Sequence, residues 1–136
     1  MVAYSFQKQF AAPILEGTKR QTIRADRHRH ARPGEVLQLF TGMRTRHCRR
    51  LGTATCQSIS PITLNFDARR IVYRFADGTT TIYPGGLDDF ARHDGFADWP
   101  AMRAFWAKTH PPLPAFSGWL VRWSAFHPDA AGSLGG

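Results

Sequence analysis

The chain has 136 residues, of which 43% are hydrophobic and 12% aromatic, and it carries a formal net charge of +8 at pH 7. This length predicts one domain, and the composition excludes a largely disordered protein because the apolar residues suffice for a core. No apolar run approaches the roughly 17–25 residues that span a bilayer, and no signal peptide is expected. Two cysteines cannot build a disulfide framework, so Cys48 and Cys56 are predicted to be reduced thiols in a cytoplasmic protein without a membrane partner.

The first quarter of the chain predicts a strand, a short helix and an extended segment. Residues 2–6 alternate apolar and polar side chains as a strand does. The apolar residues of segment 10–15 share one helical face, and Gly17 is placed to end that helix. Segment 17–24 is therefore the point where a helix gives way to extended chain, and residues 25–34 are expected to form a basic loop.

The middle of the chain is typical of antiparallel strands joined by turns. Five strands are predicted, at residues 35–40, 50–56, 62–66, 70–75 and 79–83. The first two form a basic hairpin, and Asp77-Gly78 is the strongest hairpin signal of the chain.

The last part predicts two helices and a strand. Residues 87–93 and 99–108 are the helices, the second with aromatic side chains at three- and four-residue spacing. Residues 116–126 alternate as a final strand, and the four tryptophans lie on periodic faces typical of a core. A single domain is predicted over residues 1–126, followed by a disordered C-terminal tail over residues 127–136.

This order of elements indicates an α+β fold. Five to seven mostly antiparallel strands flanked by two or three helices fit it. A small β-barrel is the expected closure, because it removes exposed sheet edges.

The positive charge is concentrated in the N-terminal part. Residues 1–50 hold eleven Lys and Arg against three Asp and Glu, whereas residues 51–136 hold seven of each. Fifteen of the eighteen cations are Arg, whose guanidinium suits phosphate binding and base stacking. The asymmetry favours a polyanionic partner; the alternative is a solvated basic face.

A polar triplet, Lys19, Thr22 and Arg24, follows Gly17 at the helix-to-strand junction. The spacing brings three polar side chains to one groove, although Lys-x-x-Thr alone is a common pattern that favours an ordinary surface. No metal site is predicted, because Cys48 and Cys56 form no Cys-x-x-Cys pattern with spaced histidines.

The whole arrangement resembles the ASCH family, a branch of PUA-like β-barrels associated with RNA. The resemblance extends from residue 4 to about residue 124 and implies a small PUA-like β-barrel with flanking helices. Its pieces are Phe10-x-x-x-Ile14-Leu15-x-Gly17-x-Lys19-x-x-Thr22-Ile23-Arg24, Pro33-Gly34-Glu35-Val36-Leu37-x-Leu39, Thr41-Gly42-x-Arg44-Thr45 with Cys48-Arg49, Phe90-Ala91-x-x-Asp94-Gly95-Phe96 and Phe116-x-Gly118-Trp119-Leu120-Val121-Arg122-Trp123.

One subgroup of that family is the closest functional model: amidohydrolases that remove acyl groups from N(4)-acylated cytidine, such as N(4)-acetylcytidine. The resemblance implies that Lys19, Thr22 and Asp94 are the catalytic lysine, threonine and acid. The acid is Asp where the subgroup has Glu, one methylene shorter. Asp94-Gly95 is alternatively a plain helix end followed by a turn.

Amide hydrolysis gives these residues defined tasks. Thr22 attacks the acyl carbonyl if Lys19 takes its proton, which requires the lysine pKa to fall below about 10.4. Alternatively, Asp94 activates a water while a charged Lys19 binds the oxyanion. Neither route needs a cofactor.

The substrate-binding prediction comprises four residues. Phe6 and Phe40, at strand ends, are placed to stack a pyrimidine, and Arg24 and Arg44 to contact its polar groups or a phosphate. The predicted partner is a small modified nucleoside. RNA is the alternative partner, in an RNA-binding ASCH module with or without ribonuclease activity.

Overall fold

The computed structural model describes residues 1–25, 29–75, 78–110 and 115–129. Asp77 of the predicted turn, residues 111–114 and residues 130–136 of the predicted tail lie outside this part. The strands are β1 (Val2–Phe6), β2 (Gln21–Arg24), β3 (Val36–Thr41), β4 (Arg49–Asn65), β5 (Arg70–Phe75), β6 (Gly78–Ile82) and β7 (Ala115–Pro128). The helices are α1 (Ala11–Glu16), α2 (Leu87–His93) and α3 (Trp99–Thr109), with short 3₁₀ helices at Lys8–Phe10 and Pro84–Gly86.

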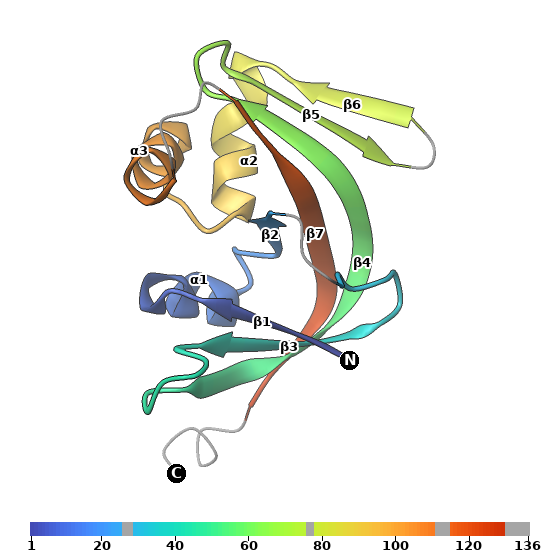
Figure 1. The fold of residues 1–136 in the computed structure, drawn as a ribbon, viewed down its shortest axis with the longest axis vertical. Helices are drawn as coiled ribbons and strands as arrows, with labels where there is room; N and C mark the ends of the chain where they lie inside the picture. The colour runs from blue at the N-terminus through green and yellow to red at the C-terminus, as the bar shows by residue number, and fades with distance from the viewer. Residues whose placement is uncertain (26–28, 76–77, 111–114, 130–136) are drawn as a thin grey trace.

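All seven described strands belong to one sheet. The path β1-β3-β4-β5-β6 is joined by β7, which pairs with both β4 and β2. Only the β1–β3 pair is parallel among the described pairs, so the prediction of an α+β fold with mostly antiparallel strands is confirmed. The long strands β4 and β7 curve together, and the three helices lie on the inner side of that curve (Figure 1).

The predicted closed barrel is wrong for the described residues. No backbone ladder joins β1 to β2 there, so the sheet stays open between these two strands. The gap between β1 and β2 is bridged by a side chain instead: Arg24 Nη2 donates to the carbonyl of Ser5 at 2.7 Å. The opening this leaves is the location of the pocket described below.

Strand β4 replaces two predicted strands. Residues 50–56 and 62–66 are parts of one strand of 17 residues, which continues through Pro61. Register shifts against β7 occur at Thr53/Thr55 and Cys56/Ser58, and residues 58–61 pair with β7 alone in the described sheet. Proline is tolerated where a strand has a partner on one side only, so Pro61 does not end this one.

The core lies between the helices and the inner face of the sheet. Helix α1 ends at Gly17, whose φ of 86° is the left-handed conformation that glycine adopts readily. Helix α3 begins at Asp98, whose side chain accepts from the amide of Ala101. Trp99, Trp106 and Trp123 are buried as predicted; Trp119 is half-buried.

The sheet continues past the predicted domain end. Strand β7 runs to Pro128, and the Asp129 amide donates to the carbonyl of Leu51 at 2.9 Å. The Asp129 carboxylate also pairs with Arg50. Residues 127–129, predicted as tail, are therefore part of the folded sheet. None of the helices in the described part is long and apolar enough to cross a membrane.

Candidate functional site

A cavity of about 240 Å³ opens where β1 and β2 fail to pair. One wall comes from the end of β1 and the 3₁₀ helix, including Phe6 and Phe10. The opposite wall comes from β2 and from the segment between α2 and α3. The cavity therefore gathers side chains from three separate parts of the chain, residues 5–10, 19–25 and 94–110.

Lys19 is buried against this cavity by the turn that follows α1. Its amide donates to the carbonyl of Pro13 at 3.0 Å, which folds the chain back after the helix. Its side chain is only 3% exposed. The ammonium donates to the carbonyls of Gln21 at 2.8 Å and Asp94 at 2.5 Å. Two carbonyls thus fix two of the nitrogen's protons, and they hold the charged ammonium more strongly than the neutral amine.

Aromatic rings complete the surroundings of this lysine. Nζ lies 4.9 Å from the ring centre of Phe10 and 5.3 Å from that of Phe6. Burial lowers the pKa of Lys19 to about 8; the Asp94 charge opposes this and the Arg24 charge adds to it. Desolvation is therefore the main cause of the lowered pKa, and the nearby cation is a smaller one. Arg20 turns away and contacts the His93 ring at 2.7 Å.

Asp94 is the acid that faces Lys19. It is the C-cap of α2, so the interpretation of Asp94-Gly95 as a helix end is also correct. Its carboxylate Oδ1 lies 3.9 Å from Lys19 Nζ and accepts from Gln21 Nε2 at 3.4 Å. Burial raises the pKa of Asp94 to about 6, against the opposing effects of Lys19, the Gln21 hydrogen bond and Arg24. The site therefore holds an acid and an amine whose pKa values have moved toward each other and bracket neutrality.

Thr22 is held by Arg24, two residues further along β2. Arg24 Nε donates to Thr22 Oγ1 at 2.9 Å. The guanidinium also stacks on the rings of Phe6, at 4.8 Å, and Tyr4, at 5.4 Å. The hydroxyl oxygen accepts from a cation, which stabilises negative charge on it and leaves its own proton to be donated elsewhere.

Five of the seven predicted site residues line this one cavity: Lys19, Thr22, Asp94, Phe6 and Arg24. Phe40 and Arg44 do not, which corrects their predicted placement. Phe40 lies between buried Leu39 and Thr41 on β3 and points to the opposite face of the sheet. Arg44 is exposed in the turn between β3 and β4.

Two residues in or beside the cavity were not predicted: Gln21, which contacts Asp94 from outside the lining, and His110, which is part of the lining. Gln21 is 1% exposed and holds Asp94, but a glutamine next to a basic motif carries no signal of its own. His110, expected only as a helix end, lines the cavity and stacks on Trp106 with ring centres 4.0 Å apart. Burial lowers the pKa of this imidazole. Among the described residues, no group of three or more His, Cys, Asp or Glu is placed to hold a metal ion.

No family model and no curated protein sequence matches the chain. Two solved structures do: the crystal structure of ASCH from Zymomonas mobilis, with a TM-score of 0.54, and that of a tyrosine-to-phenylalanine mutant of the same protein, with 0.53. Both are 13% identical to this chain and cover 93% of it, and the chain covers 68% and 70% of them. At this identity the likeness concerns the fold, and it supports the ASCH fold that the sequence motifs predicted.

Proposed function

We propose that this protein is an amidohydrolase that cleaves the N-acyl amide of N(4)-acylated cytosine or cytidine, such as N(4)-acetylcytidine. The observation that carries the proposal is the buried Lys19, whose pKa is lowered to about 8 within a cavity that Thr22 and Asp94 also line. A lysine at an ordinary surface position stays solvated. Lys19 is instead desolvated in a cavity that a threonine hydroxyl and an acid also line, which is typical of a functional site.

The reaction uses each group once. Thr22 Oγ1 attacks the acyl carbon as its proton passes to neutral Lys19, and the new C–O bond gives a tetrahedral oxyanion near Arg24. The C–N bond then breaks, and protonated Asp94 supplies the proton to the departing exocyclic nitrogen of cytosine. Water cleaves the Thr22 ester, which releases the carboxylic acid and restores the hydroxyl. The stacked rings of the cavity wall suit a planar pyrimidine.

A water route uses the same residues in the other proton arrangement. Ionised Asp94 activates water, and charged Lys19 stabilises the oxyanion while Thr22 only positions the substrate. Replacement of the Thr22 hydroxyl separates the two routes, because only the first forms an ester on it.

The test is release of cytidine from N(4)-acetylcytidine by the purified protein, followed by liquid chromatography. We expect stoichiometric cytidine and acetate, with turnover beyond one equivalent of enzyme. A panel of longer acyl chains and the free base defines the range. Absence of turnover across the whole panel would reject the amidohydrolase.

RNA binding is the second candidate function, and one observation favours it. Arg44 and Arg46 are exposed in the turn between β3 and β4 and have no ion pair among the described residues. An unpaired basic turn suits phosphates of a nucleic acid. A single-stranded RNA run in parallel in the same assay identifies this function if the RNA is bound or cut while the amide is untouched.

The pH profile should be bell-shaped. Activity requires one proton on the Lys19–Asp94 pair, so kcat/KM should rise through the Asp94 pKa of about 6 and fall through the Lys19 pKa of about 8. Both proton arrangements give this same bell. Initial rates from pH 4.5 to 10 measure it. The acid limb should keep its position in His110→Gln; an acid limb that moves with that variant assigns the titration to the histidine instead.

A further inference from the structure

A second and larger cavity lies next to the Lys19 pocket and is not used by the proposed chemistry. It is an open groove of about 1340 Å³ between the 3₁₀ helix, α1 and the ends of β1 and β3. Ser5, Phe6 and Gln7 line both spaces, so the two are neighbours across one short segment. A ligand held in the pocket can therefore extend into this groove.

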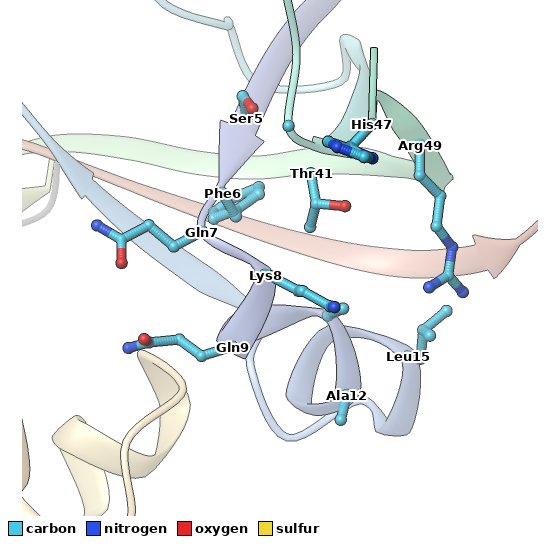
Figure 2. A pocket seen from close by; sticks show the side chains of 12 residues that line it. Ser5, Phe6, Gln7, Lys8, Gln9, Ala12, Leu15, Thr41, His47 and Arg49 are labelled. Atoms are coloured by element: carbon cyan, nitrogen blue, oxygen red, sulfur yellow. The ribbon is translucent and has the colours of Figure 1, made fainter. Parts of the chain in front are cut away.

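The groove collects two cationic side chains and a histidine from separate elements. Lys8 comes from the 3₁₀ helix, His47 from the turn before β4, and Arg49 from the first residue of β4. Figure 2 shows the Lys8 ammonium and the Arg49 guanidinium directed to the same space beside α1, with the Thr41 hydroxyl facing it. No acidic residue of the described chain lines the groove.

These cations have unused bonding capacity. Neither Lys8 nor Arg49 forms an ion pair with an acid of the described chain. Arg49 Nε is buried and donates to no acceptor of the described chain. A buried donor without an acceptor costs free energy, as do like charges held together, and a bound anion would relieve both.

The side chains of the groove wall indicate which chemical class of ligand the groove can bind. A guanidinium and an ammonium that converge beside a hydroxyl match the several oxygens of a phosphate ester. Gln7 and Gln9 add neutral amides to the lining, and Gln7 also lines the Lys19 pocket. Such groups suit a sugar hydroxyl.

We infer that the groove is a phosphate-binding subsite and that the substrate is a phosphorylated nucleoside, with its phosphate between Lys8 and Arg49. The placement of the acylated base in the Lys19 pocket rests on the proposed function; the phosphate subsite stands on the groove alone. This subsite also gives a role to Arg49, a basic residue at the start of β4 that the amide hydrolysis does not use.

The kinetic test compares N(4)-acetylcytidine with its 5′-monophosphate. At low salt, kcat/KM should be about tenfold higher for the monophosphate, the effect of one charge-assisted contact. In Lys8→Gln/Arg49→Gln this ratio should fall to about one. The matched control is Arg70→Gln/Arg74→Gln, which removes the same charge from β5, at the end of the sheet away from α1 (Figure 1), and should keep the ratio. A ratio of one in the unchanged protein overturns the inference.

A binding test distinguishes failure of the phosphate subsite from failure of the proposed amide hydrolysis. Titration calorimetry with cytidine 5′-monophosphate, cytidine and a cytidine-containing RNA oligonucleotide needs no turnover. Binding of the monophosphate at least about tenfold tighter than cytidine, lost in Lys8→Gln/Arg49→Gln, supports the subsite even if no amide is hydrolysed. Binding of the oligonucleotide alone, lost in the same variant, supports the subsite with an RNA chain as the phosphate source. Equal affinity for the three ligands, or affinity that the variant keeps, overturns it.

Discussion

Lys19→Met is expected to lower kcat/KM for N(4)-acetylcytidine at least ~100-fold. Methionine keeps the length and apolar stem that pack on Phe6 and Phe10 but removes the amine that Gln21 and Asp94 hold through their carbonyls. The variant loses the base of one route and the oxyanion cation of the other. Chromatographic rates with saturating and limiting substrate measure the loss.

The controls separate chemistry from folding. Lys108→Met changes an exposed lysine of α3 and should keep the rate, and thermal melting should show that Lys19→Met remains folded. Thr22→Val then distinguishes the routes: a comparable loss favours the threonine ester, and a small loss favours the water route. A folded Lys19→Met with undiminished rate would remove the lysine from the mechanism.

Gly95→Ala is expected to cost about 2–4 kcal/mol of unfolding free energy, because two penalties combine. Its φ of +97° is left-handed, and an added Cβ would lie 2.8 Å from Lys19 Cδ and 3.0 Å from Phe10 Cδ1. The lysine stem must shift to make room. We therefore expect kcat/KM to fall at least ~10-fold as well, since small misplacements of a catalytic group are costly.

Gly34→Ala is the matched control for this variant. Gly34 has a similar φ of +87°, but an added Cβ would have no atom within 4 Å. The unfolding free energy of this variant should therefore fall only by the backbone cost of roughly 1–2 kcal/mol, and its activity should be unchanged. Urea unfolding and initial rates of both variants measure the difference. Equal stability losses in the two variants would show that the contact with Lys19 carries no penalty.

Most elements of this fold are predictable from local patterns, and the errors arise where long-range pairing decides. Residues 2–6 alternate and form β1, and Gly17 ends α1 as expected. Local patterns predict two strands where β4 runs on through Pro61, a residue type that seldom lies inside a strand. Its effect depends on the number of neighbouring strands, which no local pattern records. The prediction of a closed barrel was wrong for a similar reason, because local patterns do not show that the sheet is interrupted between β1 and β2, where the pocket opens.

The site residues also fall into two groups, those that local patterns predict and those that depend on long-range pairing. Lys19 and Thr22 lie three residues apart, so one turn and one strand bring both to the cavity. Asp94 was found only through the family resemblance, as it lies 75 positions beyond Lys19. Phe40 was misplaced because strand alternation gave its neighbours the inner face. The partners of Asp94 and Arg24, Gln21 and the Ser5 carbonyl, have no signature that a sequence displays.

The pairing of β2 has a consequence for biosynthesis. Within the described sheet β2, which carries Thr22, pairs only with β7, through Gln21–Arg24 against Trp119–Arg122. A ribosome makes the threonine early and its strand partner about a hundred residues later. Until β7 has been synthesised, β2 lacks the strand with which it pairs and is exposed to chaperones and to mispairing. The cavity that Thr22 lines is therefore completed only after β7 has left the exit tunnel.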